Sequence, residues 1–463
     1  MKKDSGVTST VLKSRFSGKR VLIMGLGVHG GGLEAAKFFL RVGARVTITD
    51  RRSAKDLSKS LSVLRSFLKG SPYPRVRLRL GTHDMDDFTH AEVILKNPGV
   101  RPDSPYLVAA RKRGIPVISD ISLFFELSPA PIIGITGTRG KSTTAYLLAE
   151  FLKHARGGLR RVWLGGNIRK SVFEFLPRIR KNDRVVLELS SFQLMDIARV
   201  KKSPQIAVIT NLLNDHLNWH RSAEEYAYAK SLLFRFQGSS DHLFMPARDR
   251  VLAKLTRGAK AHIHTTVLSP EYQRIVSKTI GAHYESSVGL AIAVARMHGV
   301  PHRAIKKVLA RFRGLPSRQE EIRTWRGIHF VNDTTATIPD AVVVALRRFA
   351  EISKKRGGGL VLIAGGSDKK LEFIPLAQEI HAHAKYVVFL PGDATGRMKR
   401  VLTRTGFKRF SEARSMDEAV RFALRRARAG DTILLSPGAA SFGLFLNEFD
   451  RGDAFERAVK RFG

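Results

Sequence analysis

A glycine-rich segment near residue 140 combines the residue types that bind phosphate. The apolar run 132–135 is followed by residues 136–144, which read TGTRGKSTT, and then by an amphipathic stretch at 145–153. Glycines let backbone amides point at phosphate oxygens, the lysine supplies a positive charge, and the serine hydroxyl can ligate Mg²⁺. The strict phosphate-loop pattern has a glycine where this chain has Ile135. Because strand, loop and helix follow in the required order, we predict a loop that binds ATP or GTP.

A carboxylate at the end of a second strand is a candidate ligand for the metal ion of that nucleotide. The apolar run 185–187 leads directly into Glu188, and parallel sheets bind ligands at the carboxyl ends of their strands. An isolated acid in this place is usually structural, but after a phosphate loop it indicates Mg²⁺ binding. His216 and Lys230, the latter in a predicted helix at 223–236, are not singled out by physical reasoning alone.

A further glycine-rich turn, Gly25-x-Gly27-x-x-Gly30, lies between a predicted strand at 21–24 and a helix-forming run at 33–40. Asp50 ends the next predicted strand, about 20 residues further on. Such glycines let the backbone approach a pyrophosphate, and such an acid accepts hydrogen bonds from a ribose or a base. The turn fits a nicotinamide-binding domain, and it also fits a turn that only packs a helix on a strand.

The chain that carries these motifs is strongly basic. Its 463 residues include 80 Lys and Arg against 40 Asp and Glu, which gives a net charge of +40. This charge favours anionic partners, but Lys and Arg recur throughout the chain, so we interpret most of it as general surface charge. The absence of cysteine excludes disulfides, thiolate metal sites and a cysteine nucleophile. The polar N-terminus and the lack of an apolar run of about 20 residues predict a soluble, cytoplasmic protein.

An α/β fold must position these motifs, because short apolar runs alternate with longer amphipathic segments. The predicted strands form three series, at 21–24, 46–49 and 93–96; at 132–135, 161–164, 185–189 and 206–210; and at 328–331, 360–364, 387–390 and 432–435. Prolines at 129 and 131 and the Gly-Leu-Pro at 314–316 mark the junctions. We predict three consecutive domains on parallel sheets: Rossmann-like at 1–129, P-loop ATPase-like at 130–315, and Rossmann-like at 316–463.

Taken together and in order, these residues resemble the Mur ligase family of ATP-dependent amino-acid ligases, and most closely its glutamate-adding member. The resemblance covers nearly the whole chain. It is carried by 137–143, by Gly-Gly-Asn-Ile at 165–168, by 187–194, and by a C-terminal pattern of Ser436-Pro437, Ser441-Phe442, Asn447 and Arg451-Gly452. It implies that the first domain binds the UDP part of a substrate instead of a nicotinamide.

The resemblance also implies roles for individual residues, with Lys141, Glu188, His216 and Lys230 at the catalytic centre. The residues implied around the UDP group are Val28, His29, Asp50, Arg51, Arg52 and Gly99, and those on the sugar and alanyl portion are Asn167, Ser190 and Gln193. The residues implied for ATP are Gly137, Thr138, Arg139, Gly140, Lys141, Ser142, Thr143, Arg318 and Asp333. The ligands implied for two Mg²⁺ ions are Ser142 and Glu188, and His216 with a carbamylated Lys230. The third domain is implied to meet the incoming amino acid with Thr335, Thr337 and Ser441.

The implied reaction activates a carboxylate. The terminal carboxylate of UDP-N-acetylmuramoyl-L-alanine attacks the γ-phosphate of ATP, and the amine of glutamate then displaces phosphate from the acyl phosphate. Two Mg²⁺ ions and Lys141 would offset the negative charge that gathers in the first step. The product is a peptidoglycan precursor, so the resemblance implies a part in cell-wall synthesis, cell shape and cell division. We expect a monomer without specific nucleic-acid binding or membrane insertion.

The chain departs from the family pattern at the acceptor site. The family motif Asn-Asp-Ser-Lys-Ala-Thr-Asn reads Asn-Asp-Thr-Thr-Ala-Thr-Ile at 332–338, so Thr335 replaces the lysine that binds the carboxylate of glutamate. A hydroxyl cannot supply that ion pair, which leaves the identity and chirality of the added amino acid open. We hypothesise that another basic residue of the third domain takes this part. Arg139, Tyr284, Ser287 and Ser317 are further departures around the nucleotide.

Other functions compete with this interpretation. A sister ligase would use L-glutamate, another amino acid or a folate-type substrate, and the segment 187–194 argues against folate. A nicotinamide oxidoreductase would account for Gly25 to Gly30 and Asp50 but leaves the ATP loop unexplained. A nucleotide-dependent nucleic-acid-binding protein would use the net charge.

Overall fold

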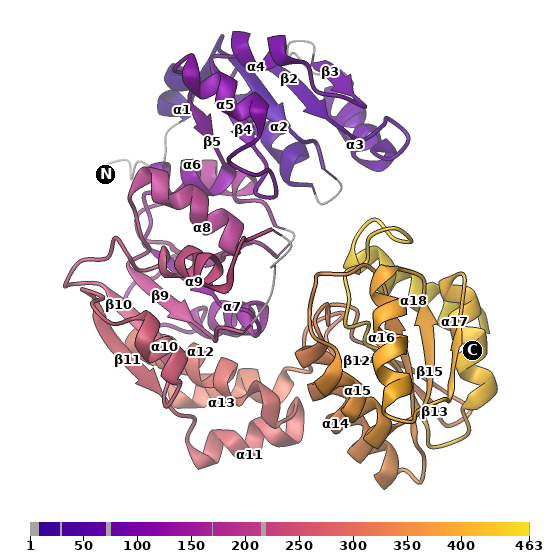
Figure 1. The fold of residues 1–463 in the computed structure, drawn as a ribbon. Coiled ribbons are helices and arrows are strands. Elements are labelled where there is room, and N and C mark those ends of the chain that lie inside the picture. Colours follow the sequence, from indigo (N-terminus) through magenta and orange to yellow (C-terminus); the bar gives the residue numbers. More distant parts are fainter. Residues whose placement is uncertain (1–8, 28–29, 71–75, 169, 214–218, 463) are drawn as a thin grey trace. The chain divides into compact units, whose positions relative to one another are not determined.

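The computed structural model describes residues 9–27, 30–70, 76–168, 170–213 and 219–462. Within these residues the chain forms three β-sheets in succession, each with helices packed on it; two belong to a first compact unit and one to a second (Figure 1). The predicted architecture of three consecutive α/β domains is therefore confirmed. In the described part of the chain, no helix is both long enough and apolar enough to cross a membrane.

The first sheet is parallel, with the strand order β3-β2-β1-β4-β5. Its strands are β1 (Arg20–Met24), β2 (Arg45–Asp50), β3 (Arg77–Leu80), β4 (Val93–Lys96) and β5 (Val117–Ile118). Its helices are α1 (Ser9–Phe16), α2 (Gly31–Arg41), α3 (Ser58–Leu68), α4 (Met85–His90), α5 (Pro105–Lys112) and α6 (Asp120–Leu127). Along β1, Val21 and Ile23 enter one apolar cluster while Leu22 and Met24 enter another. Both faces of this strand are covered, which is why it reads as an unbroken apolar run.

The central sheet is also parallel, with the order β11-β10-β9-β6-β8-β7. Its strands are β6 (Ile132–Thr136), β7 (Val162–Gly166), β8 (Arg184–Glu188), β9 (Ile206–Ile209), β10 (His242–Pro246) and β11 (His262–Thr266). The α-helices of this part are α7 (Lys141–Leu152), α8 (Ser191–Ile197), α9 (Ala223–Ser231), α10 (Arg250–Leu255), α11 (Pro270–Thr279), α12 (Glu285–Met297) and α13 (His302–Arg311). Short 3-10 turns are η1 (Val172–Glu174), η2 (Leu176–Arg178), η3 (Ala198–Val200) and η4 (Ala282–Tyr284). The predicted helix at 223–236 was too long. Helix α9 ends at Ser231, and the buried Leu232 and Leu233 belong to the turn that follows it.

The third sheet has the order β12-β13-β17-β14-β15-β16. Its strands are β12 (Glu320–Trp325), β13 (Ile328–Asn332), β14 (Leu360–Gly365), β15 (Ala384–Leu390), β16 (Phe410–Glu412) and β17 (Thr432–Leu435). Its helices are α14 (Pro339–Lys355), α15 (Ile374–His383), α16 (Asp393–Arg404), α17 (Met416–Arg426) and α18 (Glu448–Phe462). The predicted strands of this series pair in parallel, and β12, which the sequence did not predict, adds to them as an edge strand antiparallel to β13. Arg326 and Gly327 both have positive φ (49° and 73°), which is the turn geometry that joins two strands of a hairpin.

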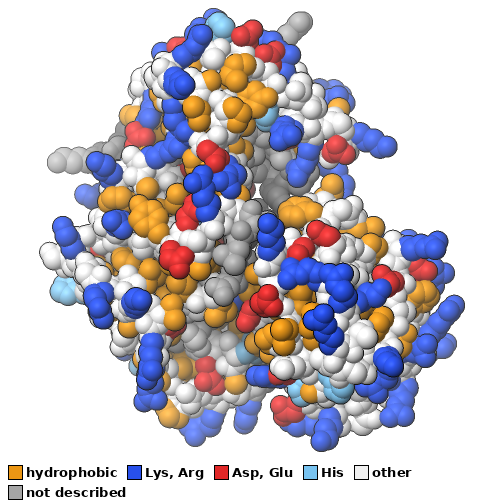
Figure 2. Space-filling model, in the orientation of Figure 1, with side chains coloured by type: hydrophobic (Ala, Val, Ile, Leu, Met, Phe, Trp, Pro, Cys, Tyr) orange, Lys and Arg blue, Asp and Glu red, His pale blue; other side chains and the backbone are white. Residues whose placement is uncertain are grey.

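The basic residues of the chain are spread over its surface. Figure 2 shows Lys and Arg side chains across the visible face, with Asp and Glu scattered among them and no single basic stripe. Exposed ion pairs such as Arg15 with Glu126 and Lys355 with Glu351 use some of these cations, and pairs of this kind contribute little to stability. This distribution agrees with the interpretation of a generally basic surface.

The first two domains meet around the start of α6. Ser119 caps this helix through a reciprocal pair of hydrogen bonds with Ser122, and Asp120 follows as its first residue. Burial raises the pKa of Asp120 to about 6, and the nearby Asp196 adds to the rise, while the Ile121 amide and Lys96 oppose it. The carboxylate form of Asp120 is therefore disfavoured in the folded protein.

Asp120→Asn should make the protein more stable at pH 8 than the wild type, with a smaller gain at pH 4.5. The folded-state pKa of Asp120, about 6, lies above the unfolded value of about 3.9, so the wild type loses stability as the pH rises between these values. Asparagine keeps an oxygen that accepts from the Ile121 amide. Urea unfolding at both pH values measures the effect, with the exposed Asp103→Asn as control. An equal gain at both pH values would contradict this assignment.

Candidate active site

Two glycines of the phosphate loop have backbone conformations that exclude a side chain. Gly137 has φ 144° and Gly140 has φ 81°. A Cβ on Gly137 would lie 1.9 Å from the Thr210 Oγ1, and one on Gly140 would lie 2.4 Å from the Ser287 Oγ. The loop leads into α7, whose first residue is Lys141. Strand β6, the loop and the helix therefore follow one another as the sequence predicted.

The side chain of Asn211 holds this loop in shape. Its Oδ1 accepts hydrogen bonds from the backbone amides of Thr138 (3.2 Å) and Arg139 (2.9 Å), and its Nδ2 donates to the Arg139 carbonyl (3.0 Å). The Thr210 hydroxyl donates to the same carbonyl at 2.5 Å. Sequence reasoning did not assign Asn211 to the site, although a polar pair directly after the buried strand β9 was the signal for it.

A buried carboxylate lies beside the loop. Glu188, the last residue of β8, is 2% exposed. Its Oε2 accepts from the Ser142 hydroxyl at 2.5 Å, and its Oε1 accepts from the side-chain amide of Asn167 at 2.9 Å. A carboxylate and a hydroxyl beside a phosphate loop are the oxygen donors with which proteins hold the Mg²⁺ of a nucleotide, so this pair fits that ion.

Two lysines point their amines at carbonyls of the same loop. Lys230, 1% exposed on α9, donates to the Gly137 carbonyl at 2.8 Å. Lys141 donates to the carbonyls of Gly137 (2.9 Å) and Thr138 (3.0 Å). His216, the predicted companion of Lys230, lies outside the described residues. Among the described residues, no group of three or more His, Cys, Asp or Glu side chains is arranged to hold a metal ion.

The segment after Glu188 forms the start of α8. Ser190 and Gln193 cap the helix reciprocally. The backbone amide of Gln193 donates to the Ser190 Oγ (3.3 Å), and the backbone amide of Ser190 donates to the Gln193 Oε1 (3.0 Å). Gln193 is buried. Asn167 contacts Glu188, and Ser190 and Gln193 fix the start of the helix that follows it; their expected contact with the sugar and alanyl portion stays a prediction.

The first domain forms a second loop site. Gly25 and Gly27 have positive φ (101° and 67°), and the Gly27 amide donates to Asp50 Oδ2 at 3.1 Å. The side-chain amide of Asn97 donates to the Gly25 carbonyl at 2.8 Å. Gly99, Arg51 and Arg52 are exposed, and the predicted Val28 and His29 lie outside the described residues.

The third domain brings three loops together at the carboxyl ends of the neighbouring strands β13, β17 and β14. Asp333 is buried after β13 and accepts from the Ser436 hydroxyl at 2.8 Å and from the Gln319 amide at 3.2 Å. The Thr335 hydroxyl donates to the Ser317 carbonyl at 3.1 Å. Ser441 and Arg318 lie in the same domain; Ser441 is buried and Arg318 is half-buried.

A lysine that sequence reasoning did not name lies among these loops. Lys369, after β14, is 9% exposed, and its amine donates to the Thr337 hydroxyl at 3.2 Å. The adjacent Ser367 pairs with Ala440 through backbone hydrogen bonds of 2.8 and 3.1 Å, which ties this loop to the one that carries Ser441. The domain thus offers a buried amine and several hydroxyls at one edge of its sheet.

Comparisons with known proteins agree with this arrangement. Residues 19–119 match the description "Mur ligase MurD-like, N-terminal domain", residues 135–305 "Mur ligase middle domain", and residues 317–438 "Mur ligase, glutamate ligase domain". A UDP-N-acetylmuramoylalanine--D-glutamate ligase of Roseiflexus sp. (strain RS-1) is 37% identical, over 97% of this chain and 100% of the relative. The chain belongs to the Mur ligase family. A ligase of the same name from Borreliella burgdorferi is 32% identical, over 96% of this chain and 98% of the relative.

Solved structures of Mur ligases share the fold. The UDP-N-acetylmuramate-alanine ligase of Thermotoga maritima superimposes with a TM-score of 0.61 at 19% identity, over 96% of this chain and 100% of that one. A murein peptide ligase of Psychrobacter arcticus gives a TM-score of 0.57 at 18% identity, over 96% of this chain and 98% of that one. This Mur ligase therefore has the three-domain architecture of its family.

Gly137→Ala should abolish nucleotide binding, because the added Cβ would lie 1.9 Å from the Thr210 Oγ1. The loop would have to move away from Thr210 and Asn211, and its backbone amides would lose their arrangement. Calorimetric titration with an ATP analogue measures the loss. The control is Gly396→Ala, which lies within α16 with open space around the new methyl and should retain binding. Retained binding in Gly137→Ala would show that the loop tolerates displacement.

Proposed function

We propose that this Mur ligase joins D-glutamate to UDP-N-acetylmuramoyl-L-alanine at the expense of ATP, forming ADP and phosphate. The observation that carries the proposal is the buried Glu188 held by Ser142 at the end of the phosphate loop. That arrangement supports nucleotide chemistry at the carboxyl edge of the central sheet. The printed names of relatives that align over nearly the full chain support the choice of substrates.

In this proposal the first domain holds the UDP group. Asp50 accepts hydrogen bonds from the Gly27 amide of the glycine turn and from the Arg52 amide of its own loop, so its position is fixed before a ligand arrives. Arg51 and Arg52, whose side chains are exposed, would meet the diphosphate. The roles of Val28, His29 and Gly99 stay part of the same proposal.

The chemistry follows from the groups around the phosphate loop. A carboxylate oxygen of the alanyl substrate attacks the γ-phosphorus of ATP and ADP leaves; the glutamate amine then attacks the acyl carbon and phosphate leaves. Lys141 and the N-terminus of α7 stabilise the negative charge of the phosphates. Ser142 and Glu188 would hold Mg²⁺, which supplies further positive charge to the phosphate oxygens. Asn167 keeps Glu188 oriented through its hydrogen bond of 2.9 Å.

Carbamylation of Lys230 belongs to this proposal as well. The amine is buried next to the loop, and it donates to the Gly137 carbonyl. A carbamate keeps one N–H on that nitrogen, so the hydrogen bond can persist, and it adds anionic oxygens that can ligate a metal. With His216 it would form the second metal site.

We also propose that Lys369 supplies the cation that Thr335 lacks. Glutamate carries an α-carboxylate and a side-chain carboxylate, and each needs a cation or several donors when it is removed from water. Lys369 presents a buried amine beside the Thr337 hydroxyl, in the domain that matches the glutamate ligase description. Arg451 is less suited, because its guanidinium donates to Thr334 and to the Ala439 carbonyl.

The remaining expectations extend the proposal. The domain boundaries at 129/130 and 315/316, a cytoplasmic and monomeric protein, and a part in cell shape and cell division stay predictions. So do the contacts of Arg318 and Asp333 with ATP and of Ser441 with the incoming amino acid.

The proposed activity is tested by phosphate release from ATP in the presence of UDP-N-acetylmuramoyl-L-alanine and either enantiomer of glutamate. Release should require the UDP substrate and should be faster with D-glutamate than with L-glutamate. Glu188→Gln should lose nearly all of it, because the carboxylate charge is gone. A preference for a neutral amino acid would overturn the proposed acceptor. ATP hydrolysis stimulated by RNA and indifferent to the UDP substrate would favour a nucleic-acid-binding protein instead.

Lys369→Met should raise the KM for glutamate about tenfold or more, since a charge-assisted hydrogen bond contributes roughly 1.5–3 kcal/mol. The KM for ATP should stay within twofold of the wild type. Lys370→Met is the matched control, because Lys370 is the adjacent lysine and is exposed. Initial rates over a range of glutamate concentrations give both values. An unchanged KM in Lys369→Met, or an equal rise in Lys370→Met, would refute the assignment.

A further inference from the structure

A buried ion pair joins the first domain to the central domain. The Lys96 Nζ lies 2.8 Å from the Asp196 Oδ2, and the two side chains are 2% and 4% exposed. Lys96 is the last residue of β4 in the first sheet, and Asp196 lies on α8 of the central domain. The bond therefore connects elements that belong to different sheets.

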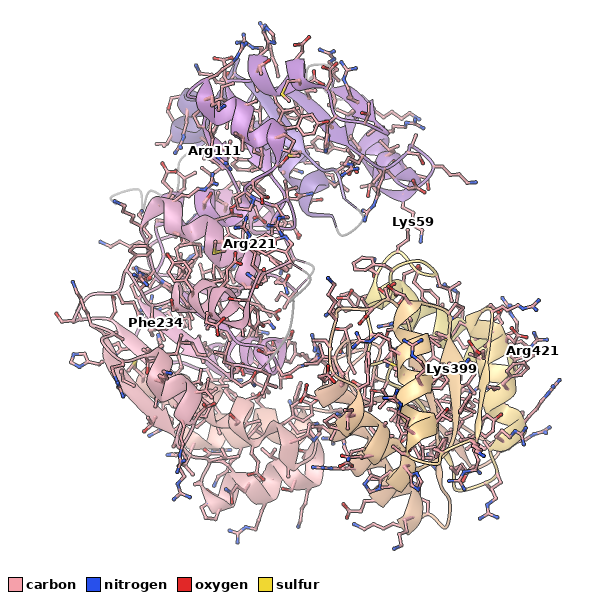
Figure 3. The ribbon with its side chains drawn as sticks, viewed as in Figure 1. Lys59, Arg111, Arg221, Phe234, Lys399 and Arg421 are labelled. Atoms are coloured by element: carbon pink, nitrogen blue, oxygen red, sulfur yellow. The ribbon has the colours of Figure 1, made fainter. Side chains whose placement is uncertain are left out.

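Other polar groups surround this pair. Ser119 donates to Asp196, Arg199 adds positive charge near it, and the Asp120 carboxyl lies close to both partners. Burial lowers the pKa of the guanidinium of Arg111, which is labelled in Figure 3, while the negative charge of Asp196 raises it. A buried ion pair is often no more stabilising than well-packed apolar side chains of the same volume. What it adds over them is a defined distance and direction between its partners.

On the first-domain side, the pair is directly connected to the glycine turn. Asn97 follows Lys96 in the chain, and its side chain donates to the Gly25 carbonyl at 2.8 Å. A Cβ on Gly25 would lie 2.5 Å from the Asn97 Nδ2, so Asn97 and the turn fit closely. A displacement of Lys96 would therefore displace the turn that accepts the UDP group.

On the central-domain side, the pair is connected to the phosphate loop. Asp196 lies on α8, a helix of two turns whose cap residue Ser190 is separated from Glu188 by one residue. Glu188 in turn accepts from Ser142 of the phosphate loop at 2.5 Å. One short helix and three side-chain bonds, the ion pair among them, thus connect the Gly25 turn with the phosphate loop.

We infer that Lys96 and Asp196 are positioning residues whose ion pair sets the separation between the UDP-binding turn and the phosphate loop. The inference rests on the proposed function, in which the substrate must reach from the first loop to the second. Its carboxylate has to lie within about 3.5 Å of the phosphorus that it attacks, and a misplacement of about 1 Å can lower the rate about a hundredfold. The ion pair lies on the chain of contacts that connects the Gly25 turn with the phosphate loop.

A positioning role can be separated from a stabilising one by replacing both charges at once. The double variant Lys96→Met with Asp196→Leu removes both charges of the pair together, so that neither partner is left buried without the other, and it should unfold at a urea concentration close to that of the wild type. UDP and an ATP analogue, each bound on one side of the pair, should keep their dissociation constants. The kcat for substrate-dependent phosphate release should nevertheless fall about a hundredfold.

Asp196→Glu provides a second test that preserves the charge. The added methylene lengthens one partner by about 1 Å, so the pair can form only at a changed separation, and kcat should fall while UDP and the analogue still bind. The control is Arg79→Met with Asp87→Leu, which removes a group of ion pairs that lies within the first domain and should leave kcat within about twofold.

The outcomes separate the inference from the proposed function. Absence of substrate-dependent phosphate release in the wild type would contradict the proposed function itself. An active wild type with an unchanged kcat in Asp196→Glu and in the double apolar variant would overturn the positioning role alone. A loss of kcat that is matched by weaker binding of UDP or of the analogue would show damage within one domain and would also overturn it. A loss of kcat with both ligands still bound supports the inference.

Discussion

The buried carboxylate of Glu188 is the constraint on which the arrangement of the central domain depends. A charge removed from water has to be met by hydrogen bonds, and Glu188 obtains them from Ser142 on one oxygen and from Asn167 on the other. Those donors come from the segments that follow β6 and β7. Because β8 lies between β6 and β7 in the sheet, one acid fixes both loops relative to its own strand.

The same physical solution recurs in the other two sheets. Asp50 ends β2 and accepts from the amides of Gly27 and Arg52, and Asp333 follows β13 and accepts from Ser436 and the Gln319 amide. In each sheet an acid at a strand end ties its own loop to a loop that is distant in the sequence. These polar contacts help to order the carboxyl edges and keep backbone and side-chain donors there.

The sequence predicted most of the inner strands and the phosphate loop because their signals are local, although it missed β10 of the central sheet. Apolar runs and glycine spacing identified β1, β6, β8 and β14. The edge strand β11 was missed because its HIHTT sequence is mostly exposed and lacks an apolar run. The roles of Asn211, Lys369 and the pair Lys96 with Asp196 depend on contacts between residues about 30 to 100 positions apart. Such contacts leave no pattern within a single segment.

The loop after β13 shows why a motif read position by position can mislead. Thr335 removes a lysine from the loop after β13, yet Lys369 brings an amine to Thr337 from the loop after β14. In the sheet only β17 lies between these strands, so their loops open onto the same edge. A ligand there meets the charge of the amine regardless of which strand precedes it, because Coulomb attraction depends on distance and dielectric alone. A substitution that removes a lysine from one loop therefore still leaves a positive charge at the edge when a neighbouring loop carries another.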